Sequence, residues 1–466
     1  MRHVDFEFLN EFIRGELSAQ QALRSLIGHL AEQCPECRSA LALLVDELTS
    51  TAEMLVSDEA GGQAPACDLA GLRAALPDPR YVGALDKLEN EARDWARRVR
   101  AEKKRARADL RVLRRLPAGE RAERIRTARS RFRSRAFAEL LLEDARRLGR
   151  TDPEEAAALA DLVPLAVLWI PGAQGQEWAR TIQLHAAACR ANALRVAGRI
   201  RDADRAFADL RAEIARSPVE DPAVLAEVAS LEASLRMNRQ EWSEARELLR
   251  RAELFYRLEG DLTGVAKIAL KRGIVERWSG ELADAVRIYR RALDHLDPAE
   301  SPHLFLCALS NLSLALCDDG RFHEAEALLA EHEAVYRRHG DAWSRPLELW
   351  MIAQIAAGLG RAEAAEERFL EVREHYVEVG DGFHAALVSL DLAALYLEQG
   401  RTAELRQVAA VMRDLFAAEG LTDHALAALA LFQQAVAAET VTVAAIRAWR
   451  RQLERAGWSP EEERVA

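Results

Sequence analysis

Glycine recurs at a fixed interval of forty residues in the C-terminal half of the chain, at Gly280, Gly320, Gly360 and Gly400. A second series is offset by half an interval, at Gly260, Gly340, Gly380 and Gly420. Self-similarity at a fixed period is typical of a repeat array, in which each unit buries its apolar face by stacking on its neighbours. The sequence therefore predicts a solenoid over more than half of the chain.

Each forty-residue unit is expected to contain two helices. An apolar-periodic segment precedes the glycine, as in VAKIALKRGIVERWSG, and a second follows it, as in ELADAVRIYRRALDHL. The glycines of the first series should lie at the turn between the two helices, where a left-handed residue is needed and only glycine avoids a Cβ penalty. The half-interval glycines are expected to end each second helix in the same way. Runs of β-branched residues at period two are missing, so no sheet is expected.

Small and large residues alternate at fixed offsets within these units. A small residue follows the glycine by five positions, and a larger apolar one comes four positions later, in the pairs Ala285/Tyr289, Ala325/Leu329 and Ala365/Phe369. Another small residue precedes the glycine by seven, at Gly273, Ser313, Ala353 and Ala393. This pattern resembles the tetratricopeptide repeat, with a period of forty instead of thirty-four and therefore longer helices. The resemblance implies an all-α fold, a right-handed α-α superhelical solenoid that binds protein or peptide partners.

The first helix of each pair should form the concave wall of such a superhelix. Residues that project from these helices, away from the packing face, are the candidates for binding a partner. They are Lys267, Lys271, Arg277, Asn311, Trp350, Gln354 and Asp391. Each could equally be an ordinary solvated or interhelical residue.

Two cysteines near the N-terminus have the spacing of a metal site. Cys34 and Cys37 form a Cys-x2-Cys pair, which lets two thiolates face one ion from a tight turn. His29 precedes them at the end of an amphipathic segment, and His3 can complete four nitrogen and sulfur ligands for zinc.

These residues, with the turn GELSAQQ between them, resemble the zinc-finger domain of bacterial anti-sigma factors. That family has an N-terminal ligand and then His-x3-Cys-x2-Cys at the head of a third helix. Here the first ligand is His3 rather than cysteine, and four residues separate His29 from Cys34. The resemblance implies a small helical domain, a zinc ion, and a sigma factor as partner. A metal-free form of the same fold and a coincidental cysteine pair remain the alternatives.

A strongly basic segment follows. Although the net charge of the chain is −11, residues 93–150 contain 21 basic and 8 acidic residues. This segment should form a long helix up to a break at Pro117, followed by another helix. It could bind a phosphate backbone, or it could be a solvated face that complements the acidic array.

The expected domain organisation follows from these segments: 1–57 zinc-finger-like domain, 58–84 linker, 85–150 basic helical connector, 151–183 helical lead-in, 184–420 repeats, and 421–466 capping helices and tail. No phosphate-binding loop, HExxH or GxSxG motif is present, so we expect no enzyme. No signal peptide and no apolar segment of membrane-spanning length are found, so a cytoplasmic location is expected. Cys189, Cys307 and Cys317 are expected to be small buried residues.

Together these observations predict a non-enzymatic regulatory adaptor. Its solenoid would bind a partner protein or peptide, and its zinc-binding N-terminus would regulate transcription through a sigma factor. A plain scaffold without metal, and a nucleic-acid-associated regulator that uses residues 93–150, are the two alternatives.

Overall fold

The computed structural model describes residues 79–128, 131–149, 151–168, 170, 173–219, 221–340, 344–417, 430 and 432–457. All regular structure in these ranges is helical, which confirms the expected all-α class. The chain divides into two compact units. The first contains residues up to Pro117 together with Ala128–Leu140, and the second contains Ala118–Thr127 and Leu141–Ala466.

In the first unit, the basic segment forms the long helix α5 (Pro79–Arg114). Its C-terminal half contacts residues 131–140 of the same unit. Nε of Arg131 lies 2.5 Å from Oδ1 of Asp109, and the ring centroids of Phe132 and Phe137 are 5.4 Å apart. Helix α7 (Arg135–Leu148) begins in this unit.

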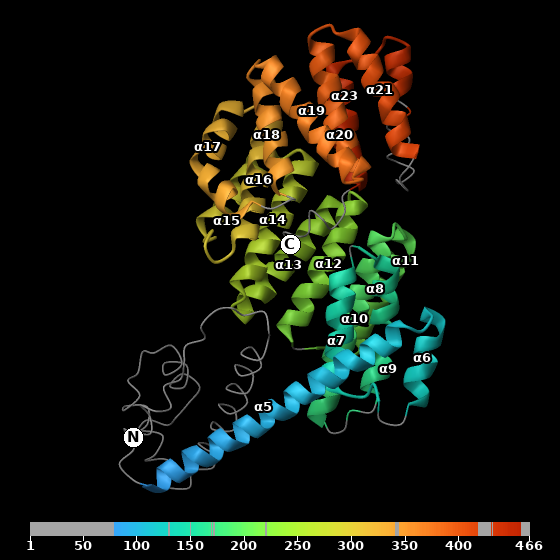
Figure 1. The fold of residues 1–466 in the computed structure, drawn as a ribbon, viewed down its shortest axis with the longest axis vertical. Helices are drawn as coiled ribbons and strands as arrows, with labels where there is room; N and C mark the ends of the chain where they lie inside the picture. Colours follow the sequence, from blue (N-terminus) through green and yellow to red (C-terminus); the bar gives the residue numbers. More distant parts are fainter. Residues whose placement is uncertain are drawn as a thin grey trace. The chain divides into compact units, whose positions relative to one another are not determined.

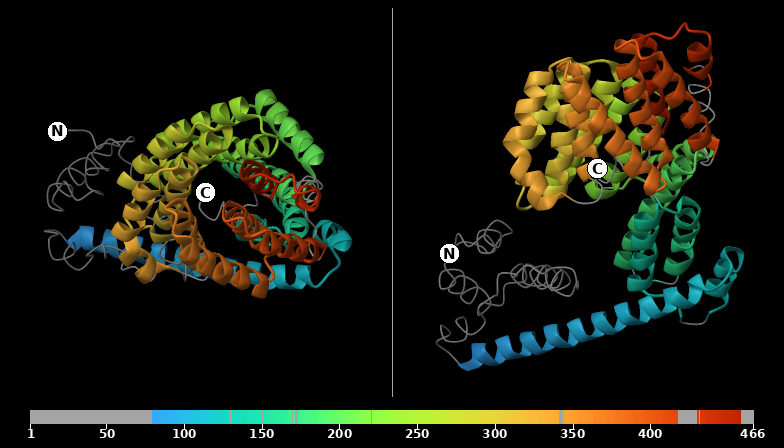
Figure 2. Two further views of the ribbon diagram at one scale, coloured as in Figure 1. Left: turned by 90° about the horizontal axis from the view of Figure 1, so that it is seen from above. Right: turned by 45° about the horizontal axis from the view of Figure 1, so that its top comes forward.

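The second unit contains a run of helix pairs, preceded by α6 (Ala118–Thr127), α8 (Pro153–Ala160) and α9 (Val163–Val167). Successive pairs follow one another around a curve, which the left view of Figure 2 shows from above (Figures 1 and 2). The pairs are α10 (Ala173–Val196) with α11 (Ile200–Arg216), α12 (Pro222–Asn238) with α13 (Trp242–Glu259), α14 (Leu262–Ser279) with α15 (Leu282–Asp294), α16 (Pro302–Asp318) with α17 (Phe322–His339), α18 (Ser344–Gly358) with α19 (Ala362–Glu378), and α20 (Gly382–Glu398) with α21 (Thr402–Ala417).

Left-handed glycines end the first helices, as the sequence predicts. The backbone φ is 96° at Gly280, 75° at Gly320, 74° at Gly360 and 69° at Gly400. The prediction for the half-interval series is wrong at Gly340, whose φ of −63° and ψ of 129° are extended. There the amide donates to the carbonyl oxygen of Tyr336 at 2.7 Å, and an added Cβ would fall on that oxygen. Close approach of the backbone, and not positive φ, requires glycine at this position.

Aspartates begin three of the first helices, at positions that share the forty-residue interval. Asp221, Asp261 and Asp381 each accept a hydrogen bond from a backbone amide in the first turn of α12, α14 and α20. An aspartate at this position satisfies an amide that the helix itself leaves unpaired, and its charge favours the helix N-terminus. In α14 and α20, an aspartate therefore marks the start of the first helix and a left-handed glycine marks its end.

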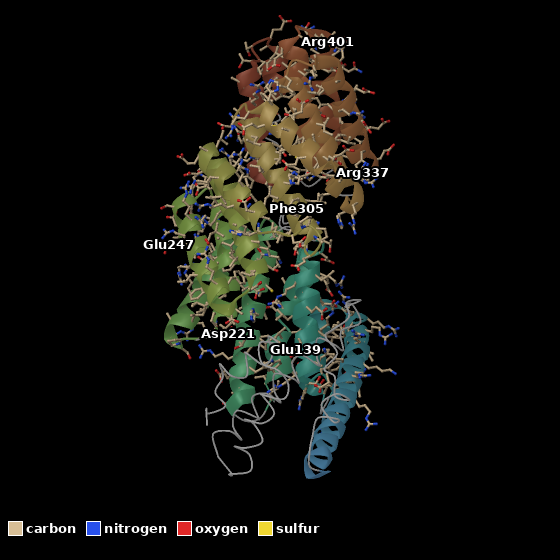
Figure 3. The ribbon with its side chains drawn as sticks, turned by 90° about the vertical axis from the view of Figure 1, so that its left-hand side faces the viewer. Glu139, Asp221, Glu247, Phe305, Arg337 and Arg401 are labelled. Carbon is tan, nitrogen blue, oxygen red and sulfur yellow. The ribbon has the colours of Figure 1, made fainter. Side chains whose placement is uncertain are left out.

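Small and large residues fit together inside each pair. Ala285, Ala325 and Ala365 are fully buried, and a Cβ added to Gly273 would overlap the ring of Tyr289. The second helices carry many charged side chains on the exposed surface, and Glu247 of α13 and Arg337 of α17 are examples (Figure 3). The first helices are consequently the more deeply buried members of the pairs.

Residues 432–437 are helical and are followed by a longer helix. Helix α23 (Val443–Gly457) packs against α20, and its Ile446 and Leu453 are buried in the same apolar core as helices α18–α21. The ring centroids of Trp449 and Phe432 lie 5.9 Å apart. None of the described helices combines the length and the apolarity that a bilayer crossing requires.

Candidate binding site on the inner face of the repeats

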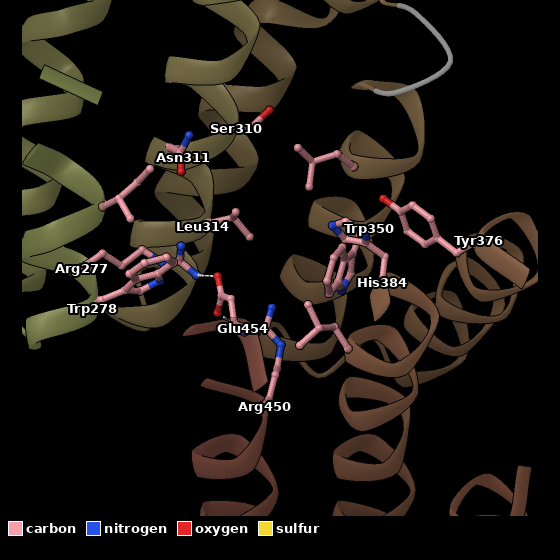
Figure 4. Close-up of a pocket in the computed structure, with 13 residues that line it drawn as sticks. Arg277, Trp278, Ser310, Asn311, Leu314, Trp350, Tyr376, His384, Arg450 and Glu454 are labelled. Carbon is pink, nitrogen blue, oxygen red and sulfur yellow. Dashed lines mark hydrogen bonds and ion pairs between the residues drawn. The ribbon is translucent and has the colours of Figure 1, made fainter. Parts of the chain in front are cut away.

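The first helices of four consecutive repeats surround one pocket, which we call the inner pocket (Figure 4). Helices α14, α16, α18 and α20 contribute most of its lining, and α19 and α23 contribute the rest. The lining residues are Ile274, Arg277, Trp278, Ser310, Asn311, Leu314, Leu347, Trp350, Tyr376, His384, Leu387, Arg450 and Glu454. The same face of each repeat therefore builds one composite surface.

Helix α23 supplies two charged side chains to this pocket. Glu454 forms an ion pair with Nη2 of Arg277, drawn as a dashed line in Figure 4. Nε of Arg450 lies 2.7 Å from Oδ1 of Asp391 on α20, although its geometry is not that of a hydrogen bond. The side chains of Arg277, Arg450 and Glu454 are all less than a tenth exposed. Charges buried this deeply must be paired, because desolvation disfavours them.

The pocket charges also have partners within the repeats themselves. Oδ2 of Asp391 accepts hydrogen bonds at 2.8 Å from Nε1 of Trp350 and from Nε2 of Gln354. Nε of Arg277 donates to Oδ2 of Asp318 at 2.6 Å. The carboxylate of Asp391 on α20 and the guanidinium of Arg277 on α14, three repeats away, are thus both held in place beside the inner pocket.

The field in the pocket favours the charged forms of Arg277 and Asp318. Burial would lower the pKa of Arg277, but the carboxylates of Glu454 and Asp318 raise that pKa well above its ordinary value. Burial would likewise raise the pKa of Asp318, whereas Arg277 and Arg450 lower it. Arg277 and Asp318 are therefore a charged pair in the neutral pH range.

Aromatic side chains form the wall beside these charges. The indole of Trp350 meets Tyr376 and His384 edge to face, with ring centroids 6.3 Å apart in both cases. The rings of Tyr376 and His384 stack at 5.0 Å. The guanidinium carbon of Arg450 lies 5.4 Å from the centroid of the Trp350 ring, within the range of a cation–π contact.

The structure brings together five of the seven residues that the sequence proposed for partner binding. Arg277, Asn311 and Trp350 line the inner pocket, while Gln354 and Asp391 join it through the hydrogen bonds described above. Lys267 is partly buried on α14. Lys271 does not project from the wall. It is 2% exposed, and its Nζ donates to Oγ of Ser230 at 3.0 Å and to Oγ of Ser234 at 3.1 Å on α12. It joins two repeats.

Sequence reasoning missed Arg450 and Glu454, because they lie in a segment interpreted only as a cap. They are spaced by four on one helix, which places opposite charges on one face. That spacing was the available signal. It does not reveal which distant residues complete the pairs, since Arg277 and Glu454 are 177 positions apart.

A second ionic cluster lies away from the inner pocket, at the start of the array. Arg146 of α7 donates two hydrogen bonds to Glu227 of α12, from Nε to Oε1 at 3.0 Å and from Nη2 to Oε2 at 2.7 Å. His185 of α10 contacts the same carboxylate. Although burial would raise it, His185 and Arg146 hold the pKa of Glu227 at about 2. Burial raises the pKa of the neighbouring Cys189 thiol to about 12.

The proposed zinc ligands His3, His29, Cys34 and Cys37 lie outside the described residues. Within the described part of the chain, no three His, Cys, Asp or Glu side chains gather as metal ligands would. Cys307 is buried as expected, whereas Cys189 and Cys317 are only partly so.

The sequence matches no protein-family model and no curated protein. Among solved structures, the chain is similar to the apo form of RapI, with 12% identity, 65% of this chain and 85% of that chain covered, and a TM-score of 0.48. A Rap protein complexed with Competence and Sporulation Factor gives 12% identity, 60% and 77% coverage, and a TM-score of 0.46. A signal transduction ATPase with a tetratricopeptide repeat sensor from Pyrococcus horikoshii gives 14%, 80% and 56%, and 0.44. These similarities concern the fold alone.

Proposed function

We propose that this protein is a non-enzymatic regulatory adaptor of the cytoplasm that binds a partner protein or peptide on the inner face of its repeats. The observation that carries the proposal is the inner pocket. Four consecutive first helices present an arginine, an asparagine, a tryptophan and an aspartate to one space. A concave surface with aromatic anchors and a few fixed polar groups suits recognition of a polypeptide.

The pocket also has a segment of polypeptide in contact with it. Helix α23 packs on α20 and forms ion pairs with side chains from α14 and α20. The surface is therefore complementary to a helix in shape and charge. A Rap protein of similar fold has been solved with Competence and Sporulation Factor bound, but the proposal for this chain rests on its own pocket.

The test compares proteins captured from lysate by the full-length chain and by two variants that each introduce an arginine. Asn311→Arg places a large charged side chain in the inner pocket and removes only a local hydrogen bond, from the Asn311 amide to the carbonyl of Cys307 in its own helix. Glu331→Arg makes a matched change on the exposed side of the second helix α17. We expect specific partners to be lost with Asn311→Arg and retained with Glu331→Arg. Equal capture by all three proteins would refute an adaptor role for the inner pocket.

We further propose that His3, His29, Cys34 and Cys37 bind zinc and that this N-terminal segment engages a sigma factor. The support is the ligand spacing and its resemblance to anti-sigma domains. Metal analysis of the purified full-length protein should give one zinc per chain, and none for a Cys34→Ser/Cys37→Ser variant. Wild-type protein without zinc would leave a metal-free domain or a plain scaffold.

The basic helix α5 favours nucleic acid as a second candidate partner. Several of its basic side chains are exposed, namely Arg98, Arg100, Lys104, Arg105 and Arg111. Binding through phosphates would weaken steeply as salt rises, since counterions are released. A measurable affinity for duplex DNA at low salt that is lost at about 0.2 M salt would support this candidate. No binding at low salt would eliminate it.

A further inference from the structure

We propose that helix α23 is a displaceable internal ligand of the inner pocket, and that the external partner is a helix carrying a basic and an acidic side chain one turn apart, as α23 does. This inference rests on the proposed adaptor function and names the chemistry of its partner. It is carried by the contacts of α23, by the hydrogen bonds within the pocket, and by the space that α23 leaves.

With α23 in place, the pocket has little room for anything else. The remaining cavity is about 50 Å³. That volume holds a few water molecules and is several times smaller than the roughly 300–1,000 Å³ of sites that take drug-sized ligands. A peptide can therefore reach Arg277 and Trp350 only if α23 leaves.

The pocket groups Asp391 and Arg277 keep hydrogen bonds within the repeats when α23 is removed. Asp391 keeps the hydrogen bonds from Trp350 and Gln354, and Arg277 keeps Asp318. Loss of a partner is most damaging when it leaves a buried charge with no polar partner, and here Asp391 would keep two hydrogen-bond donors and Arg277 would keep a carboxylate. The pocket is preorganised by the repeats, and α23 makes use of groups that are already fixed.

The contacts of α23 define the chemistry of the partner. Arg450 meets the carboxylate of Asp391 and the face of Trp350, and Glu454 meets the guanidinium of Arg277. Arg450 and Glu454 are four positions apart, so one face of a helix delivers both charges. Ile446 and Leu453 add the buried apolar contacts. The geometry calls for an amphipathic helix with the pattern Arg-x3-Glu and apolar residues on the adjoining face.

Tethering gives α23 an advantage over an external helix. Residues 418–442 connect it to α21, and a tethered segment meets its site at an effective concentration on the order of millimolar. An external ligand at micromolar concentration must therefore bind about a thousandfold more tightly than α23 to displace it. Weakening α23 alone should make the same pocket receptive to a weaker ligand.

The experiment measures binding of a fluorescent peptide with the sequence of residues 443–457, VAAIRAWRRQLERAG, to the full-length protein by anisotropy. The variant Arg450→Gln/Glu454→Gln weakens α23 and leaves the pocket residues of the repeats unchanged. Arg451→Gln changes the neighbouring exposed arginine of the same helix and is the matched control. We expect the double variant to bind the peptide at least about tenfold more tightly than the wild type and Arg451→Gln do. A peptide with glutamine in place of Arg450 and Glu454 should bind at least about tenfold more weakly than the wild-type peptide.

Hydrogen exchange provides the second readout. Saturating peptide should accelerate amide exchange in residues 443–457 of the chain, because the internal helix is displaced. Equal affinity of the peptide for all variants, no binding to the double variant, or unchanged exchange would each overturn the proposal. These results are independent of partner capture. If the peptide results contradict displacement of α23, the adaptor function can still hold. If partner capture refutes the adaptor function, the peptide assay can still show competition between the peptide and α23.

Discussion

The fit of Gly273 against Tyr289 gives a prediction that can be worked out from the structure. A Cβ added to Gly273 would lie 2.8 Å from Cδ1 of Tyr289 and closer still to Cε1 and Cζ, although Tyr289 is fully buried and cannot swing aside. Overpacking of this kind costs about 1–3 kcal/mol, while alanine in a helix gains roughly 1 kcal/mol over glycine. We expect Gly273→Ala to lower the free energy of unfolding by about 1 kcal/mol.

A double-mutant cycle separates the steric effect from helix propensity. The corresponding large position in the next repeat is Leu329, so leucine is compatible with this place in the fold. In a Tyr289→Leu background the ring is gone, and Gly273→Ala should then stabilise by about 0.5–1 kcal/mol. The expected coupling between the two sites is therefore about 2 kcal/mol.

Urea unfolding of the full-length variants, followed by circular dichroism at 222 nm, measures each corner of the cycle. Gly119→Ala in α6 is the control, because no atom lies within 4 Å of the added Cβ, and it should not destabilise. Coupling below about 0.5 kcal/mol, or stabilisation by Gly273→Ala alone, would refute the view that close helix approach requires glycine here.

A carboxylate, two thiols and a left-handed glycine can each be tested separately. Because the pKa of Glu227 is lowered from 4.5 to about 2, the group contributes about 3 kcal/mol to the free energy of unfolding above pH 4.5, and this contribution is lost as the pH falls through about 2. Glu227→Gln should therefore make the loss of stability with falling pH less steep in that window. An unchanged pH profile would contradict the role of the cluster. Burial raises the pKa of Cys189 and Cys317 to about 12, which lowers their thiolate fraction about a thousandfold relative to a pKa of 9.0. Alkylation of the folded protein at pH 8, followed by mass spectrometry, should therefore be at least about a hundredfold slower than alkylation of the protein unfolded in urea. Gly280 has a φ of 96°, and no atom lies within 4 Å of the position that a Cβ would take. Gly280→Ala should therefore lower the free energy of unfolding by about 1 kcal/mol through backbone strain alone, and Gly280→Asn should lower it less. Equal melting temperatures for the two variants would argue against backbone strain as the cause.

The repeat architecture could be predicted because its determinants are local. A left-handed turn needs glycine, and a fixed interval between such turns defines two-helix units, so Gly280 and Gly320 are informative without any knowledge of distant contacts. The aspartates at Asp221, Asp261 and Asp381 carry a matching local signal for helix starts that the sequence reasoning did not use. Gly340 shows the limit of the rule, because glycine can also serve close approach of the backbone.

The binding site was harder to predict because its pairs are distant in sequence. A helical period places Lys271 and Arg277 on first helices, but it does not say which neighbour each charge meets. Lys271 finds two serine hydroxyls of the preceding repeat, and Arg277 finds a carboxylate on a helix beyond the array. Both outcomes depend on superhelical curvature, which arises from many small packing angles and is not encoded at any single position.

The bridge made by α23 has a mechanical consequence. Arg450 and Glu454 are one helical turn apart, with Cβ atoms about 5–6 Å from each other, yet they reach side chains on α14 and α20, three repeats apart. This is geometrically feasible only while the array bends back towards itself. The helix therefore acts as a brace, and stretching the array along its axis must break these ion pairs before the repeats can uncoil.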